Sequence, residues 1–586
     1  MLTVVVGRKY IRRVVRALWL LPALVLLALP LAPLPASAQA QVGQIIAPAL
    51  AAEMAAYPLE RIPIIIEMSA PRAPFATPVS VSLAQQAVNI LNTYGQAVGA
   101  VSIIQGAAGY ATPAGIQAMS QLPQVAAIEQ DAVVRPRRTA AAAPAWPAGQ
   151  LTSLYPQEVN ATRVWQQGGS GLGVTVAVLD SGIAADPDLG NRIQAEVGFA
   201  GPFDPQRPDL GGHGTHIAGT IAGDGTRSSG EYVGIAPRAN LVSIQVLGKN
   251  GNGRISSVLR GIEWAIAHKA QYNIRVLNLS FGAHPLGSYK TDPLAAAVEI
   301  AWKQGIVVVA AAGNGGPSSG TVESPGIDPY IITVGATDDQ ATLTLNDDAL
   351  AWFSAWGTPT DSTAKPDMLG AGRRVVSIRV PGSSIDTMLP DHVVTASNGS
   401  TYTRLTGTSM ATAVVSGAVA LLLERQPALK PDQVKQTLTK TSQPFGQSTS
   451  TAGAGAGLPG AGAGLLDAYA AATSLPRGSA NAGLRVADGA ARMLYASLYG
   501  QPLAWNSATY LGTNWTQFTW LTLPWTSATW DNIAWDNIAW DNIAWDNIAW
   551  DNIAWDNIAW DNIAWDNIAW DDTEWNNIAW DSFNID

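Results

Sequence analysis

The sequence predicts an α/β domain over residues 151–475, with a parallel central sheet and helices on both faces. Two observations predict this class. Several segments are apolar throughout, as strands buried on both faces are, and they alternate with runs whose apolar residues recur at helical spacing. A small α+β unit precedes this region and a tail of five-residue repeats follows it. The 586 residues therefore divide into several parts, since ordinary domains hold about 100 to 200 residues.

Residues 1–38 have the composition of a secretory signal peptide. Five basic residues fall within the first sixteen, an apolar run covers 17–32, and Ala36-Ser37-Ala38 supplies the small side chains that a signal peptidase needs. The alternative is a retained membrane anchor, but prolines interrupt the run and leave it short for a spanning helix of about 20 residues. The sequence therefore predicts cleavage near Ala38 and a secreted, extracellular protein.

Composition excludes several classes of function. Charged residues are 13% of the chain, against roughly a quarter in average soluble proteins. The net charge is −10, and the charged residues are spread without a basic block. Nucleic acid is therefore not an expected partner. The chain has no cysteine, which rules out disulfides, thiolate metal sites and cysteine nucleophiles. No residues have metal-ligand spacing, so the sequence predicts no metal site.

Residues 41–138 form the predicted α+β unit. The stretch "RIPIIIEM" at 61–68 is strand-like, 81–95 carries apolar residues at helical spacing, and 125–138 alternates like a strand before it turns basic. Residues 139–150 lose all periodicity and gather Ala and Pro, which is typical of a linker. The sequence therefore predicts a domain boundary there.

The central region holds the elements of the predicted sheet. Apolar runs predict strands, and the runs between them predict helices. The strands are expected at 173–180, 241–248, 274–282 and 305–314, and the helices at 213–223, 256–270 and 292–304. Active sites of such sheets form where the strands reach their carboxyl ends. Polar residues at those ends are therefore the candidates for chemistry.

Four polar residues stand out there. Asp180 ends the first strand, His213 opens the first helix, and Ser409 begins a helix over 409–424. A nucleophile at a helix N-terminus gains from free backbone N–H groups, which can bind an oxyanion. Histidine can remove the serine proton near neutral pH, and a buried aspartate can support the imidazolium. Asn314, at the end of another strand, offers an amide donor to the same oxyanion.

At these residues the sequence resembles the subtilisin-like serine proteases, the subtilase or peptidase S8 family. The order Asp180, His213, Ser409 matches, and so do "VAVLDSGI", "GGHGTHIAGTIAG" and "LTGTSMATAVVSGAVALLL" around them. The resemblance covers about 60–475 and implies a serine endopeptidase that cleaves proteins through an acyl-enzyme, with Asn314 as oxyanion donor. Each residue alone could be a turn or capping residue. No cofactor is required for this chemistry, and calcium, common in the family, would need ligands that the sequence does not assign.

The resemblance also implies substrate-binding residues. Segment 280–282 is similar to the family strand that, with 311–313, walls the pocket for the residue before the cleaved bond. Segment 251–253 is similar to the one whose backbone pairs with extended protein or peptide substrates. The implied substrate-binding residues are Gly251, Asn252, Gly253, Ser280, Phe281, Gly282, Ala311, Ala312 and Gly313. Whether Phe281 lines the pocket or packs in the core stays open.

Residues 41–138 resemble the inhibitory propeptide of the family, especially at 122–134. This implies an intramolecular chaperone and inhibitor whose C-terminal stretch occupies the cleft until the chain is cut. The cut is expected between Arg135 and Gln150. The alternative is a small permanent domain.

The C-terminal part has another character. Residues 476–504 are predicted to be a linker with a short helix, and 505–586 form a Trp-rich tail. An aromatic residue recurs at every fifth position, and "WDNIA" repeats unchanged eight times from Trp530. With a five-residue step, successive Trp side chains would alternate between the two faces of a strand, and in a helix they would wind around its surface. Two structures therefore stay open, a coiled β-solenoid with Trp and Ile inward, and disorder.

The repeats also keep a second class of function open. Regularly spaced aromatic faces and carboxylates suit contact with glycans, the cell envelope or another copy, and identical repeats also favour aggregation. The leading prediction is a secreted protease, associated with the cell surface if the tail attaches there. The alternative is a catalytically idle surface or binding protein whose tail mediates attachment.

Overall fold

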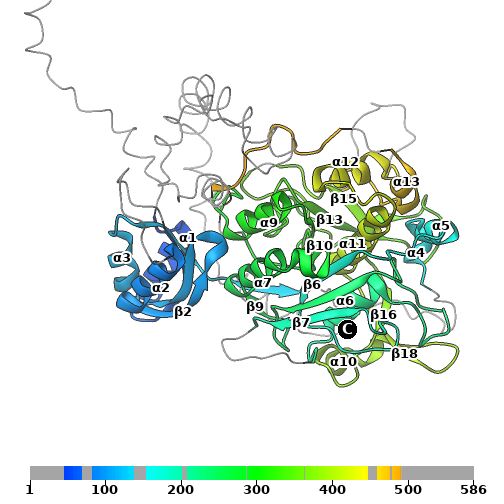
Figure 1. Cartoon of the computed structure of the whole chain (residues 1–586), viewed down its shortest axis with the longest axis horizontal. Helices are drawn as coiled ribbons and strands as arrows, with labels where there is room; N and C mark the ends of the chain where they lie inside the picture. Colours follow the sequence, from blue (N-terminus) through cyan, green and yellow to red (C-terminus); the bar gives the residue numbers. More distant parts are fainter. Residues whose placement is uncertain are drawn as a thin grey trace, which may run out of the picture. The chain divides into compact units, whose positions relative to one another are not determined.

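The computed structural model describes residues 45–68, 82–136, 153–200, 208–285, 287–361, 363–445, 458–475, 478–488 and 490 (Figure 1). All of them belong to one compact unit that begins at Ile45. The predicted signal peptide, the linker 139–150, the Trp-rich tail and most of the helix expected before it lie outside these residues.

The α+β unit has a four-stranded sheet in the order β2-β3-β1-β4, in which β1 pairs antiparallel with β3 and β4. Its elements are α1 (Pro48–Ala56), β1 (Ile62–Met68), α2 (Leu83–Tyr94), β2 (Gly95–Val101), β3 (Gly106–Ala111), α3 (Pro113–Ser120) and β4 (Val125–Gln130). Ile64 and Ile66 of β1 pack with Leu91 of α2 and Ile116 of α3 in a core of their own. The strand expected at 61–68 is β1, and the helix expected at 81–95 is α2.

The predicted parallel sheet is confirmed. Its strands have the order β14-β13-β12-β10-β6-β8-β7, and β15 pairs with β13. They are β6 (Thr175–Asp180), β7 (Ile193–Gly198), β8 (Asn240–Gln245), β10 (Ile274–Leu279), β12 (Val307–Ala311), β13 (Ile332–Asp338), β14 (Ala349–Leu350) and β15 (Met368–Ala371). Only β14 is antiparallel to its neighbour in this sheet. Every residue of β6, β12 and β13 is buried, so both faces are covered.

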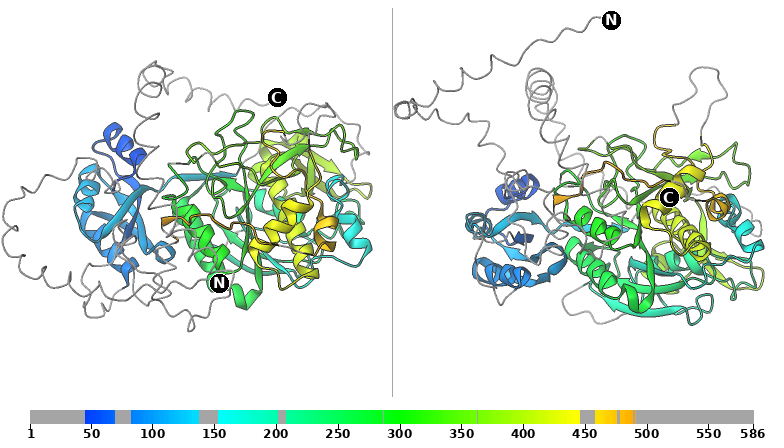
Figure 2. Two further views of the ribbon diagram at one scale, coloured as in Figure 1. Left: turned by 90° about the horizontal axis from the view of Figure 1, so that it is seen from above. Right: turned by 45° about the horizontal axis from the view of Figure 1, so that its top comes forward.

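Two pairs of packed helices accompany the sheet. Helices α7 (Ile255–Ala267) and α9 (Pro293–Lys303) lie side by side, and so do α6 (His213–Ala222) and α11 (Thr408–Arg425) (Figure 1; Figure 2). Among the described residues, α11 alone is long and apolar enough to cross a membrane, but 89% of its apolar window is buried. That burial is typical of a core helix.

Shorter elements complete the domain. A small antiparallel sheet has the order β16-β18-β17. The remaining elements are η2 (Ser102–Ile104), β5 (Val133–Pro136), α4 (Tyr155–Glu158), α5 (Ala161–Gln166), β9 (Gly253–Arg254), α8 (Lys269–Tyr272), β11 (Phe281–Gly282), β16 (Val375–Ile378), α10 (Ser384–Met388), η3 (Pro390–His392), β17 (Val393–Thr395), β18 (Thr401–Leu405), α12 (Pro431–Thr441) and α13 (Ala468–Thr473).

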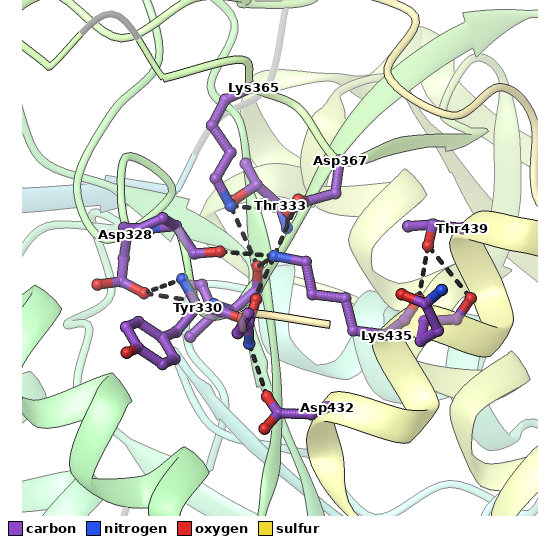
Figure 3. Close-up of polar contacts among 12 residues, drawn as sticks. Asp328, Tyr330, Thr333, Lys365, Asp367, Asp432, Lys435 and Thr439 are labelled. Atoms are coloured by element: carbon purple, nitrogen blue, oxygen red, sulfur yellow. Dashed lines mark hydrogen bonds and ion pairs between the residues drawn. The ribbon is translucent and has the colours of Figure 1, made fainter. Parts of the chain in front are cut away.

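Buried charges join α12 to the central sheet (Figure 3). Lys435 of α12 donates to the carbonyl oxygens of three consecutive residues, Pro329 to Ile331, at 2.6 to 3.3 Å, and its ammonium lies 2.9 Å from Asp367. Lys365 contacts the other carboxylate oxygen of Asp367 at 2.7 Å. Burial alone would raise the pKa of Asp367, but the two ammonium groups outweigh it and the pKa is lowered. Burial lowers the pKa of Lys365 to about 8.

Residues 478–488 and Ala490, which fall in the part predicted to be a linker with a short helix, are bound to the domain. Asn481 donates from Nδ2 to Tyr330 O at 2.9 Å and to Asp432 Oδ1 at 2.7 Å. The backbone N–H of Ala487 donates to Glu299 Oε2 at 2.8 Å, and Ala487 and its neighbours are part of the main core. The chain therefore stays attached to the domain for about fifteen residues beyond the predicted domain end.

Candidate active site

Asp180 and His213 form a buried pair. Asp180 is the last residue of β6, and His213 is the first residue of α6. His213 Nδ1 lies 2.8 and 2.9 Å from the two carboxylate oxygens of Asp180, and the residues are 1% and 0% exposed. Gly212, the residue before the helix, has a φ of 88°, which glycine adopts without strain. The turn that presents His213 therefore needs glycine at this position.

The pair leaves the second ring nitrogen of His213 available. His213 Nε2 is buried and has no hydrogen-bond partner within the described part of the chain. A proton held on Nδ1 by Asp180 leaves the Nε2 lone pair free to accept another. His216, one turn further along α6, instead bonds the carbonyls of Val375 and Thr403. Burial lowers the pKa of His216 to about 3, which fits a structural histidine.

Asp209 holds the turn before α6, and the sequence analysis missed it. Its Oδ1 accepts from Ser181 Oγ at 2.8 Å and from the Gly212 N–H at 2.7 Å. Its Oδ2 accepts from the N–H and the hydroxyl of Thr215 at 2.8 and 2.7 Å. Burial raises the pKa of Asp209, while these hydrogen bonds oppose the rise. The available signal was an aspartate four residues before His213 in a glycine-rich turn.

Ser409 lies at the same edge of the sheet. Strands β6 and β10 pair in parallel up to Leu179 and Leu279, so Asp180 and Ser280, the next residues, stand side by side. Ser409, in the first turn of α11, donates from Oγ to Ser280 O at 2.9 Å. The helices that carry the candidate base and nucleophile also pack against each other. The topology thus brings the three predicted triad residues to the carboxyl edge of two neighbouring strands.

Asn314 is held through its amide oxygen. Its Oδ1 accepts from the backbone N–H of Thr408 at 3.0 Å and from the Thr408 hydroxyl at 2.9 Å. The same hydroxyl accepts from the Gly313 N–H at 3.3 Å. Asn314 Nδ2 is buried and has no partner among the described residues. A backbone N–H fixes which amide atom is the oxygen, so Nδ2 is the remaining donor of a side chain that holds Thr408, the residue before Ser409. Thr408 is a further site residue that the sequence analysis missed.

The strand β5 of the α+β unit lies between two predicted substrate-binding segments. It pairs antiparallel with β9, where Val134 stands opposite Gly253, and with β11, where Arg135 stands opposite Gly282. The resulting three-stranded sheet has the order β11-β5-β9. The backbone of Phe281 pairs with β5, whereas its side chain is fully buried and packs in the main core.

The other predicted substrate-binding residues lie close to these segments. Gly251 and Asn252 form the turn before β9, in which Asn252 O accepts from the Gly248 N–H at 2.8 Å. Ala311, Ala312 and Gly313 are buried and lead directly to Asn314. Among the described residues, no three His, Asp or Glu side chains are grouped so that they could hold a metal ion.

Asp131 connects the α+β unit to α7. Its Oδ1 accepts from the Ser256 N–H at 2.9 Å and its Oδ2 accepts from the Ser256 hydroxyl at 2.6 Å. Ser256 is the second residue of α7, where backbone N–H groups lack partners inside the helix. Asp131 therefore caps a helix of the central domain from outside that domain.

The chain is similar in sequence to several known proteins. The family model described as "Subtilase family" matches residues 171–457. The chain is 44% identical to the serine protease AprX of Bacillus subtilis (strain 168) over 280 residues, which are 46% of this chain and 61% of that protein. It is 34% identical to an alkaline protease of Alkalihalobacillus alcalophilus over 58% of this chain and 75% of that protein. It is 36% identical to subtilisin BL of Lederbergia lenta over 50% of this chain and 93% of that protein.

Proposed function

The chain belongs to the subtilase family and is a subtilisin-like serine endopeptidase. From that premise we propose that it cleaves proteins with Ser409, His213 and Asp180 as its catalytic triad. The observation that carries the proposal is the buried Asp180–His213 pair at the sheet edge where Ser409 lies in the first turn of α11. His213 Nε2 has no hydrogen-bond partner among the residues that the structure describes, which supports its role as the base.

The proposed reaction has two halves. Ser409 Oγ attacks the carbonyl carbon of the substrate as His213 Nε2 takes the hydroxyl proton, and Asp180 stabilises the imidazolium. The carbonyl oxygen becomes an oxyanion, which accepts from Asn314 Nδ2 and from backbone N–H groups at the start of α11. His213 then gives its proton to the leaving amine, and the acyl-enzyme forms. A water molecule, deprotonated by the same histidine, hydrolyses the acyl-enzyme and restores Ser409.

We further propose that the chain is made as a zymogen. Residues 41–138 would be the propeptide, and the pairing of β5 with β9 and β11 supports this, because an extended substrate would be expected to pair with the same two segments. Maturation would cut the chain between residues 135 and 150. Residues 137–150 lie outside the described part of the chain.

Export and attachment complete the proposal. The composition of residues 1–38 supports secretion. The Trp-rich tail would hold the enzyme near its substrates through the cell envelope or glycans. The idle binding protein that the tail suggests differs from this proposal in one testable respect, which is the need for Ser409.

The test compares the purified full-length chain with a Ser409→Ala variant. Mass spectrometry follows loss of the propeptide, and casein hydrolysis is followed with time. We expect the original chain alone to cut itself between about 135 and 150 and then digest casein. Equal behaviour of the two chains would remove Ser409 as nucleophile and favour the binding protein.

A further inference from the structure

Glu323 is held between the two segments that flank Ser409. Its backbone N–H donates to the carbonyl of Ala312, just after β12, at 3.0 Å. The next residue, Ser324, exchanges two backbone hydrogen bonds with Ala283, just after β11, at 2.9 and 3.0 Å. The backbone at Glu323 therefore bridges the segments that bear the predicted pocket walls.

The Glu323 carboxylate touches both of those segments. A Cβ added at Gly282 would lie 2.3 Å from Glu323 Oε2, and one added at Gly313 would lie 3.2 Å from the same oxygen. Gly282 pairs with the bound strand β5, and Gly313 donates to Thr408, the residue before Ser409. Glu323 is only 8% exposed. A buried carboxylate thus occupies the space between two glycines beside the nucleophile.

The register of β5 shows which residue of a bound chain reaches Ser409. Strand β5 runs antiparallel to β11, and Pro136 stands opposite Phe281. The next residue of a chain bound in this register comes level with Ser280, whose carbonyl accepts from Ser409 Oγ. That residue would carry the carbonyl that is attacked. Its side chain would enter between β11 and residues 311–313, where the carboxylate of Glu323 lies.

We propose that Glu323 selects substrates with arginine or lysine immediately before the cleaved bond. This inference rests on the proposed protease function and specifies its substrate. A carboxylate at this depth attracts a cationic side chain and repels an acidic one, because its charge acts through a medium of low dielectric constant. A guanidinium or ammonium group would also form charge-assisted hydrogen bonds with it, which an apolar side chain cannot.

The sequence of the chain itself agrees with this selectivity. Residues 135–138 read Arg-Pro-Arg-Arg, so Arg137 is the residue that follows β5. The sequence therefore supplies a basic residue directly after β5, which is the position that the register assigns to the attacked carbonyl. This places basic residues within the region of the expected maturation cut.

The test measures preference at the residue before the cut. The enzyme matured from the full chain digests casein, and mass spectrometry identifies the residue at each new C-terminus. Peptide nitroanilides ending in Arg, Lys, Phe, Leu or Glu then give kcat/KM. We expect Arg and Lys to exceed Phe and Leu by about tenfold or more, and Glu323→Gln to remove that advantage without a comparable loss on Phe. Glu263→Gln, a change of the same kind on α7, is the matched control and should alter none of these values.

Several results would overturn the proposal. The proposal is overturned if the wild-type enzyme shows no preference for Arg or Lys, or if the Glu323→Gln enzyme keeps an unchanged preference. In either case, hydrolysis of casein would still support the protease function. If the Glu323→Gln chain fails to mature, an Arg137→Leu, Arg138→Leu double variant decides: slower propeptide loss supports the proposal, and an unchanged rate overturns it. Hydrolysis of neither casein nor any peptide by the wild type would overturn both this proposal and the protease function.

Discussion

Replacing Asp209 by asparagine is expected to loosen the turn that carries His213. The carboxylate accepts four hydrogen bonds at 2.7 to 2.8 Å, two on each oxygen. Asparagine keeps one oxygen and presents an NH₂ group to the donors that met the other. Two buried donors then lose their acceptor, which costs about 1 to 3 kcal/mol each.

Removal of the buried charge offsets part of that loss, since burial raises the pKa of Asp209. We therefore expect Asp209→Asn to lower the free energy of unfolding by about 2 kcal/mol or more. Urea unfolding of full-length chains in a Ser409→Ala background measures this without self-digestion. Asp391→Asn, at an exposed aspartate, is the matched control. A loss for Asp209→Asn no larger than that of the control would refute the account of the turn.

Three further predictions concern contacts away from the triad. Asp131→Ala removes the cap on α7 and should lower the free energy of unfolding of the inactive full chain by about 0.5 to 2 kcal/mol in urea. Burial raises the pKa of Asp348 to about 7. Between its unfolded pKa near 4 and pH 7 the folded chain therefore holds a proton that the unfolded chain lacks, and stability falls as pH rises. Asp348→Asn should raise Tm at pH 8 but not near pH 4, which thermal melts of the inactive full chain at the two pH values would check. Lys435→Met should lower the free energy of unfolding in urea by about 3 kcal/mol, because the Asp367 carboxylate loses one of its two lysine partners, whereas the exposed Lys440→Met should cause no measurable loss.

Sequence patterns predict the local parts of this fold well. Strand β6 was predictable because its residues form an apolar run, and its end was predictable because the polar Asp180 follows that run. Both are local properties of the sequence. The start of α11 at Thr408, next to Ser409, follows from the change to small and apolar residues. The parallel sheet was predictable because alternating strands and helices permit few other arrangements.

Contacts between distant segments could not be predicted in this way. Glu323 reaches the site because Ser324 pairs with Ala283, about forty residues earlier in the chain, and no local pattern marks that pairing. Phe281 had two interpretations until the burial of its side chain separated them. Residues 478–490 looked like a linker because their composition is small and polar, whereas what holds them is a set of hydrogen bonds that they donate to Tyr330, Asp432 and Glu299.

The attachment of residues 478–490 has a consequence for how such a protein can be altered. The last described residue, Ala490, is buried in the main core, so the sequence beyond it starts from a fixed point on the folded domain. A cut after this point would leave the hydrogen bonds of Asn481 and Ala487 in place. Cutting before residue 478 would instead separate Ala487 from Glu299. We therefore expect that another C-terminal module could be fused after Ala490, in place of the repeats, without redesign of the enzyme.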